Sequence, residues 1–419
     1  MYKRLLFIIV MCCIVVGWAQ AQENIIGRLA YIGSDNNVYT HDFASGQDTP
    51  LTTDASKTRR YQWPTWSNDD RLAYFCCDLQ AADTAKMQGY ISATGREAGR
   101  VVYEGTAAPV IYASWAPAPC DAAGTCRDLA LLINDVPVSG LRVDLVRDTG
   151  TSQISETIAR GSPFYYTWSP DATKMVFHRY GSELSLYDLA SKDISGKTDA
   201  PVTFQTPAWS PIDDRILSLV PGSEANRSTL MVSTSDVQQT PLRENLSGLL
   251  SFLWSPDGRY VAFRQFGADG EYGAVFIVDA VTGEIVARSD VKGVIAFFWS
   301  PDSTQLAYIT VNLGSGMQAS LTSDMLVAYQ GSAQLEWSVL AVVSGFNRPL
   351  YTFTPTTETI YLLLYFDQFA PSHRVWSPDS RYLVFGEVGS SNPLISIYDV
   401  QQNQQTTVAE GIFAVWSWR

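Results

Sequence analysis

The chain has 419 residues, of which 46% are hydrophobic and 12% aromatic, so it is long and apolar enough to bury a large core. This length is too great for one ordinary core and favours a repeat architecture or a large all-β unit. The formal net charge of −13 argues against nucleic acid as a partner, because nucleic-acid binding depends on a basic surface.

The N-terminus has the pattern of a secretory signal peptide. Lys3 and Arg4 precede an uncharged run of 14 residues, Leu5 to Trp18, which is too short to span a bilayer comfortably. Small residues then offer a cleavage site. We therefore expect a signal peptide at 1–21, one folded domain at 22–419, and an extracellular or periplasmic protein with no membrane span after cleavage. Retention of the segment as an uncleaved anchor is the alternative.

Tryptophans recur with the same neighbours through the rest of the sequence. The clearest copies read WSPD followed by an apolar strand, as in "WSPDGRYVAF" from Trp254. The first seven starts are 49, 53, 41, 45, 45 and 77 residues apart, and a period near 45 is that of a four-stranded propeller blade. The eight tryptophan starts are Trp66, Trp115, Trp168, Trp209, Trp254, Trp299, Trp376 and Trp416.

Each clear copy places a tight turn and a buried strand after its tryptophan. In Ser255-Pro256-Asp257-Gly258, proline presets φ at the first turn position, and glycine accepts the left-handed position that closes a bulged hairpin. The next strand mixes small and large apolar residues without alternation, which is typical of a strand covered on both faces. Because the tryptophans and turn aspartates recur, we interpret them as structural; these aspartates are Asp171, Asp257, Asp302 and Asp379.

The two ends of the sequence are complementary. Ile412 to Arg419 resembles a first strand with its tryptophan, and Gly27 to Thr52 resembles a second, third and fourth strand without a first. We therefore expect residues 22–419 to form a single all-β propeller of four-stranded blades, closed by the C-terminal strand pairing with the N-terminal blade. Eight tryptophan starts predict eight blades. The long interval after Trp299 leaves room for a ninth, and two weak copies, at Trp66 and Trp115, leave seven possible.

The WSPD repeat resembles the TolB-like family of β-propellers, relatives of the WD-repeat proteins. The motif is near-perfect at Trp168, Trp254, Trp299 and Trp376, and the resemblance covers most of residues 27–419. It implies the propeller fold and an exported bacterial protein, but it does not specify a function. TolB itself carries a separate N-terminal domain for which this sequence has no room, so a role in the Tol system is not implied.

Two pairs of cysteines follow the signal segment. Cys120 and Cys126 lie on the two arms of one hairpin, "CDAAGTC", and an exported protein meets an oxidising compartment, so we expect them to form a disulfide. Cys76 and Cys77 are expected to be either free thiols or a strained vicinal bond. No C-x-x-C motif and no nearby histidine accompanies them, so we expect no metal site.

No catalytic or cofactor motif stands out. G-x-S-x-G is absent, the three histidines fall in different blades, and acidic residues are spread over every blade. We therefore expect a monomeric, non-catalytic propeller without a cofactor that binds a protein, peptide or glycan. The alternative is an enzyme at the channel mouth, such as a glycan-active hydrolase or lyase, which would need two convergent carboxylates.

The blade that starts at Trp299 departs from the repeat. An insertion around Asn312 to Ala333 and the exit segment "YFDQFAPSHR" from Tyr365 fall on the face opposite the WSPD turns. No helical periodicity of useful length is present here. Loops that exceed what a fold requires tend to carry function, although the insertion could merely cap a large blade. The expected ligand contacts are Phe366, Asp367, Gln368, Phe369 and His373.

Overall fold

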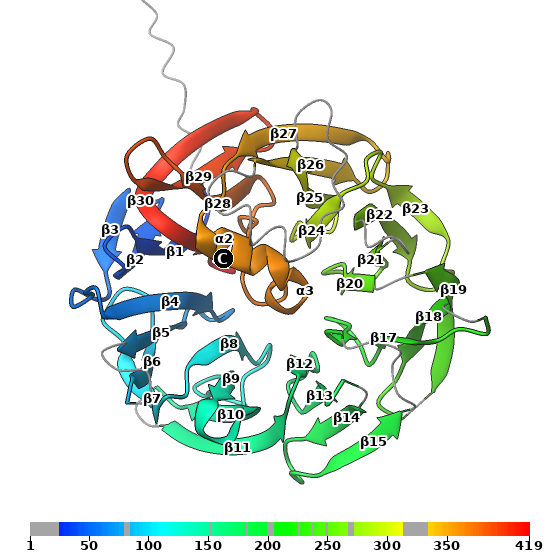
Figure 1. Ribbon diagram of the computed structural model, residues 1–419, viewed down its shortest axis with the longest axis horizontal. Coiled ribbons are helices and arrows are strands. Elements are labelled where there is room, and N and C mark those ends of the chain that lie inside the picture. Colours follow the sequence, from blue (N-terminus) through cyan, green and yellow to red (C-terminus); the bar gives the residue numbers. More distant parts are fainter. Residues whose placement is uncertain are drawn as a thin grey trace, which may run out of the picture.

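The fold is a ring of antiparallel sheets standing around one axis (Figure 1). The single all-β propeller predicted from the sequence is therefore confirmed. The computed structural model describes residues 25–78, 84–150, 153–181, 183–198, 205–224, 227–236, 238–247, 250–266, 272–312 and 334–419.

Six sheets of the ring contain four strands each. Three of them hold β4 (Arg59–Trp66), β5 (Leu72–Asp78), β6 (Lys86–Ser92) and β7 (Arg100–Thr106); β8 (Val110–Trp115), β9 (Arg127–Asp135), β10 (Gly140–Asp148) and β11 (Gln153–Gly161); and β12 (Phe164–Trp168), β13 (Lys174–Arg179), β14 (Glu183–Asp188) and β15 (Ile194–Thr198). The other three hold β16 (Ala208–Trp209), β17 (Ile216–Pro221), β18 (Arg227–Ser233) and β19 (Gln239–Ser247); β20 (Leu250–Trp254), β21 (Tyr260–Phe266), β22 (Tyr272–Asp279) and β23 (Ile285–Arg288); and β24 (Val294–Trp299), β25 (Gln305–Asn312), β26 (Gln334–Ala341) and β27 (Asn347–Phe353). A short 3-10 helix, η1 (Val136–Val138), joins β9 to β10.

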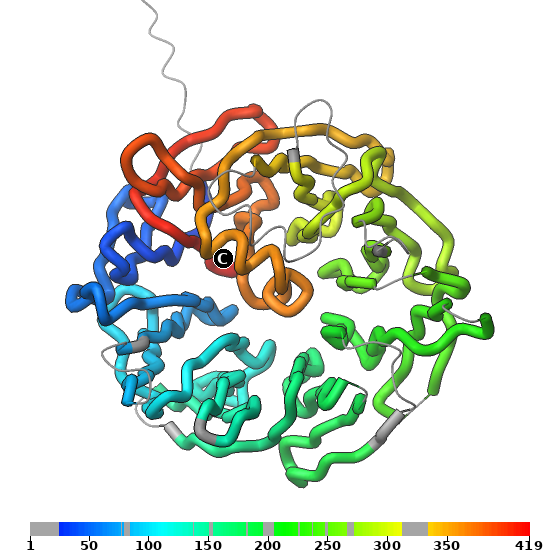
Figure 2. Tube along the Cα trace, in the orientation of Figure 1, coloured from blue at the N-terminus to red at the C-terminus, as the bar shows by residue number. Residues whose placement is uncertain are grey.

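The remaining sheet has six strands and joins the two ends of the described sequence. Its order is β28 (Tyr382–Val388), β29 (Pro393–Asp399), β30 (Gln404–Trp416), β1 (Arg28–Gly33), β2 (Val38–Asp42) and β3 (Gln47–Pro50). The first part of β30 pairs with β29, and its last part pairs with β1, with Trp416 opposite Leu29. The C-terminal strand, in red, therefore lies beside the N-terminal strand, in blue (Figure 2).

The expectation of eight separate four-stranded blades is wrong. The described strands form seven blades when each hydrogen-bonded sheet is counted as one. The physical reason is the continuity of β30, which merges the repeats of Trp376 and Trp416 into a single sheet. The ring nevertheless closes through strands from both ends, as the sequence predicts.

The recurring motif is explained by local hydrogen bonds. In three copies the serine hydroxyl donates to the aspartate two positions later, at 2.6 Å each: Ser169 to Asp171, Ser255 to Asp257 and Ser300 to Asp302. The position after the aspartate has a positive φ in each of these turns, at Ala172, Gly258 and Ser303. The serine–aspartate pair thus closes the turn, which supports a structural role for both residues.

Two strands of the six-stranded sheet are covered on both faces. All six residues of β1 are buried, as are the first six of β28. Each of these strands lies inside a sheet that is flanked by neighbouring sheets, so neither face meets solvent. Unbroken apolar runs of the sequence therefore correspond to strands that are covered on both faces.

Two helices that the sequence did not reveal lie in the link between β27 and β28. They are α2 (Thr357–Leu364) and α3 (Phe366–Phe369), and they lie over the centre of the ring (Figure 1). Thr356 caps α2, because its side chain accepts a hydrogen bond from the Thr359 backbone N–H. No helix among the described residues has the length and apolar character needed to cross a membrane.

Candidate functional site

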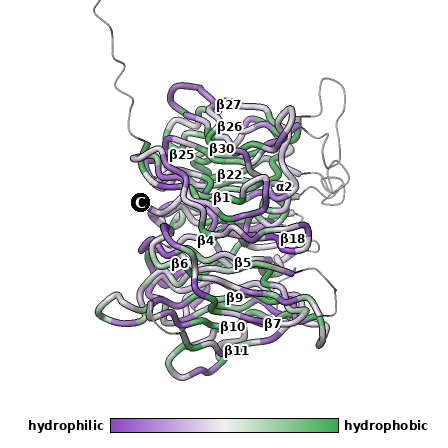
Figure 3. The backbone as a smooth tube through the Cα atoms, turned by 90° about the vertical axis from the view of Figure 1, so that its left-hand side faces the viewer, coloured by the Kyte–Doolittle hydropathy of each residue, from purple (hydrophilic) through white to green (hydrophobic). Residues whose placement is uncertain are grey.

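A cavity of about 490 Å³ lies on the axis of the ring. At one end it is lined by the WSPD-type turns, including Pro117, Pro170, Pro211 and Pro256, and at the other by the segment that contains α3. The C-terminus, which follows Trp418, and α2 lie at opposite faces of the ring (Figure 3). The helical segment thus forms one end of the cavity. The lining tryptophans are Trp66, Trp115, Trp168, Trp209, Trp254, Trp299, Trp376 and Trp418.

Most of these indoles also join one sheet to the next. The Trp115 Nε1–H donates to the Thr65 carbonyl at 2.9 Å, and the Trp376 Nε1–H donates to the Phe298 carbonyl at 3.0 Å. In both cases the acceptor is the residue that comes immediately before the tryptophan of the neighbouring sheet. The tryptophans therefore build the cavity wall while they hold the sheets in register.

The predicted contact residues of the exit segment lie largely inside the protein. Phe366, Gln368, Phe369 and His373 are buried, and Asp367 is half-buried. The Phe366 ring packs 4.8 Å from that of Phe297, between ring centroids. Asp367 and Gln368 line the axial cavity, whereas the two phenylalanines and His373 are absent from its lining.

His373 anchors the helical segment to the ring. Its Nε2 lies 2.9 Å from the Thr65 hydroxyl, and its Nδ1 lies 2.8 Å from the Ser372 hydroxyl. Burial lowers the pKa of His373 to about 3, so the imidazole is neutral at physiological pH. The Ser372 hydroxyl also donates to the Tyr112 hydroxyl at 3.1 Å. This network fastens the end of the cavity in place.

Among the described residues, two charged side chains line the cavity: Asp367 and Arg374. Neither makes an ion pair with another described residue. The Asp367 carboxylate accepts a hydrogen bond from the Gln368 backbone N–H at 3.1 Å. Burial raises the pKa of Asp367, while the nearby Arg264 guanidinium opposes that rise. Arg264 therefore offsets the charge of Asp367, and no described acidic group does the same for Arg374.

Arg374 is held against an aromatic ring. Its guanidinium carbon lies 4.3 Å from the centroid of the Trp418 ring, and its Nη1 donates to the Trp418 carbonyl at 3.3 Å. The Trp418 indole is itself fixed, because its Nε1–H donates to the Trp66 carbonyl at 2.9 Å. Burial lowers the pKa of Arg374 to about 10, so the side chain remains cationic at neutral pH.

Uncharged polar groups complete the lining beside α3. The Gln368 Nε2 donates to the Tyr166 carbonyl at 3.3 Å, while the buried Gln368 Oε1 has no hydrogen-bond partner among the described residues. The Thr206 side chain favours the charged form of Asp367 and thereby also opposes the rise of its pKa. The sequence did not point to Thr206 as a site residue, and Arg374 ends the exit segment without being one of its expected contacts. Only the closed ring brings Thr206 together with α3.

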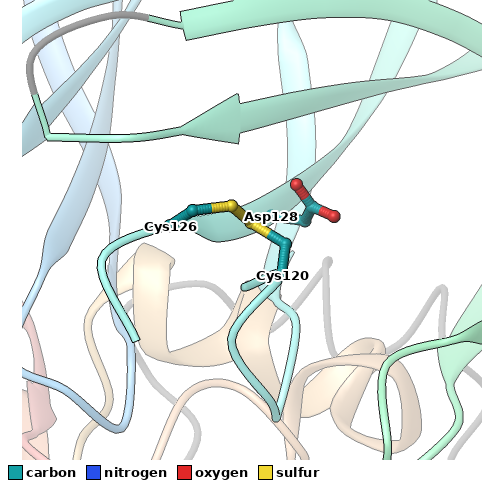
Figure 4. Close-up of side chains that lie close together, drawn as sticks. All are labelled: Cys120, Cys126 and Asp128. Carbon is teal, nitrogen blue, oxygen red and sulfur yellow. A yellow bond between two sulfur atoms is a disulfide. The ribbon is translucent and has the colours of Figure 1, made fainter. Parts of the chain in front are cut away.

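Cys120 and Cys126 are joined by a disulfide, with Asp128 beside them (Figure 4). The Asp128 carboxylate accepts two hydrogen bonds from Arg147, each 2.9 Å long. Because the sulfurs are bonded to each other and the carboxylate is paired, this cluster is occupied by structural interactions. Cys76 is buried in β5, and the side chain of Cys77 lies outside the described residues.

No protein-family model matches the sequence, and no curated protein matches it either. Solved structures do resemble the fold. A eukaryotic initiation factor is 12% identical, and the match spans 93% of this protein and 98% of that one with a TM-score of 0.53. TolB from Acinetobacter baumannii is 14% identical, and the match spans 81% of this protein and 80% of that one with a TM-score of 0.41. An oligogalacturonate lyase in complex with manganese is 13% identical, and the match spans 85% of this protein and 86% of that one with a TM-score of 0.48. At these identities the likeness shows the propeller fold alone.

Proposed function

We propose that the protein is an exported, non-catalytic propeller that binds part of a protein, peptide or glycan in its axial cavity. The observation that carries this proposal is the cavity itself: it has about 490 Å³ of space, and its aromatic and proline lining is interrupted by a few polar groups. Binding sites for small ligands and for the ends of polymers commonly have this size and composition.

The charge of the lining disfavours the enzymatic alternative. A glycan-active hydrolase uses two carboxylates, which flank the scissile bond about 5 to 10 Å apart. The described residues that line the cavity include one carboxylate, Asp367. Asp367 alone could not act as both acid and base or nucleophile across a glycosidic bond, so the lining disfavours a glycan hydrolase and favours recognition without hydrolysis.

Two further features support export. The signal-like segment at 1–21 lies outside the described residues, and its cleavage remains a proposal. The Cys120–Cys126 disulfide is typical of proteins that fold in an oxidising compartment. The two observations are independent of each other and agree with an extracellular or periplasmic location.

A cavity-filling variant tests the proposed function. Purified mature protein is screened against peptide and glycan libraries by thermal shift, and bound ligands are re-analysed for cleavage. Ala370 lines the cavity, so Ala370→Trp places a large side chain inside it. Ala190 is exposed at the turn after β14, so Ala190→Trp is the matched control.

We expect the ligands that bind the wild-type protein also to bind Ala190→Trp but not to bind Ala370→Trp. We expect the ligands to be uncleaved after binding. Hits that Ala370→Trp binds as well as the wild-type protein would place binding outside the cavity. Cleaved products would show that the protein is an enzyme.

A further inference from the structure

Arg374 carries a positive charge in the cavity wall with no acidic counterpart among the described residues. The side chain is half-buried, and one of its five N–H groups donates to a described residue, at the Trp418 carbonyl. Its remaining donors have no described acceptor. A charge withdrawn from water without a partner is costly, and a ligand of opposite charge removes that cost.

The setting of Arg374 fits a planar anion. The guanidinium lies over the Trp418 ring, and Trp418 is locked by its bond to the Trp66 carbonyl. A guanidinium fixed in this way presents its N–H donors in one plane, and two of them can bind the two oxygens of a carboxylate side by side. The donor array is therefore organised before any ligand arrives.

Arg374 is the only cationic side chain among the described residues that line the cavity, so the wall offers a charged partner for one anionic group. Asp367 lines the end of the cavity and carries the only other charge in the described lining. The lining is rich in tryptophan and proline side chains, which favour an apolar body.

We propose that the axial cavity binds a monocarboxylate with an apolar body, and that Arg374 holds the carboxylate. This inference rests on the proposed binding function and names its ligand class. A free organic acid and the C-terminus of a peptide both present this group. Arg374 follows α3, and Trp418 follows β30, so the site exists only where the closing sheet brings these two segments together.

Matched acid and amide probes test the proposal. The small probes are 3-phenylpropionate and 3-phenylpropionamide, and the peptide probes are acetyl-Ala-Ala-Leu with a free carboxylate and with a terminal amide. Binding to the full mature protein is measured by titration calorimetry at neutral pH, for the wild type, Arg374→Gln and Arg374→Lys. Circular dichroism checks that each variant is folded.

We expect the wild type to bind at least one acid about tenfold or more tightly than its amide. Arg374→Gln should lose this preference, and Arg374→Lys should keep part of it because the charge remains while the planar fork is lost. Preference for the small acid alone identifies a free organic acid as the ligand, and preference for the peptide acid identifies the C-terminus of a peptide.

Three results would overturn the inference: equal binding of acids and amides by the wild type, an acid preference that survives in Arg374→Gln, or no binding of either acid at millimolar concentration. The Ala370→Trp variant separates this failure from failure of the proposed function. Some library ligands could fail to bind Ala370→Trp and yet bind Arg374→Gln as tightly as the wild type. That result would leave the binding function intact and refute the carboxylate as the ligand class.

Discussion

At the scale of single residues, the turns that contain Asp171, Asp257 and Asp302 each have one position with a positive φ. Gly258 holds it at φ 66°, but Ala172 and Ser303 occupy the same place at φ 58° and 61°. Ser303 has a compensating interaction, because its hydroxyl accepts a hydrogen bond from the Asp257 backbone N–H at 3.0 Å. Ala172 has no side-chain group that could do so, and its Cβ makes the left-handed conformation unfavourable.

Ala172→Gly should therefore stabilise the protein. Relief of the left-handed strain is worth about 1 kcal/mol, partly offset by the greater freedom of glycine in the unfolded state. Urea unfolding should show a higher midpoint with an unchanged slope. Gly258→Ala is the reverse control and should lower the midpoint, since a Cβ there lies 2.5 Å from Ile212 Cγ1. A lower midpoint for Ala172→Gly would contradict the account of the turn.

At the scale of elements, the tryptophans at the ends of inner strands connect neighbouring sheets. The Trp115 indole bonds across to the end of the preceding inner strand, at Thr65. The equivalent Nε1 of Trp209 has no partner among the described residues, although Trp209 is buried to a similar extent, with 6% against 8% exposed. Trp115 and Trp209 thus differ in whether the indole makes a hydrogen bond to the neighbouring sheet, and not in burial.

This pair gives a test of the inter-sheet bond. Trp115→Phe should reduce the free energy of unfolding by about 1–2 kcal/mol more than Trp209→Phe, because only the former leaves a carbonyl without its donor. The loss of ring volume is the same in both variants and cancels in the comparison. Chemical denaturation of the two variants measures the difference. Equal losses would mean that packing, and not the hydrogen bond, links the sheets.

At the scale of the whole molecule, stability depends on closure of the ring. The last part of β30 pairs with β1, and the Ser417 hydroxyl accepts a hydrogen bond from the Arg28 backbone N–H at 2.9 Å. Without these residues two strand edges and their apolar faces would meet solvent, which favours association with other molecules. The same residues carry Trp418, so closure also forms part of the cavity wall.

Deletion of residues 412–419 should abolish cooperative unfolding or cause aggregation. Size-exclusion chromatography and a thermal melt of the truncated protein provide the measurement. As a control for the loss of Trp418 alone, Trp418→Ala should remain monomeric with a sharp melting transition. A truncated protein that melts at the wild-type temperature as a monomer would show that the β30–β1 pairing does not hold the ring together.

The sequence by itself determined the propeller, its closure and the structural nature of its motif. Recurrence of Trp254 and its counterparts at a blade-length period is a local signal, and so are the turn at Ser255 to Gly258 and the short spacing of Cys120 and Cys126. Each depends on residues close together in the sequence, or on one pattern repeated. Local chemistry of this kind can be recognised without knowing where distant segments lie.

The tertiary structure alone decided the blade count, the helices and the cavity. The sequence could not show that β30 runs unbroken through two repeats, because continuity of a strand depends on the partners at both of its edges. It also assigned Phe366 and Phe369 to a surface, whereas the folding of α2 and α3 over the axis buries them. Arg374 and Trp418 are 44 residues apart and meet only when the ring closes. Contacts between distant segments arise from packing in three dimensions, and no local pattern records them.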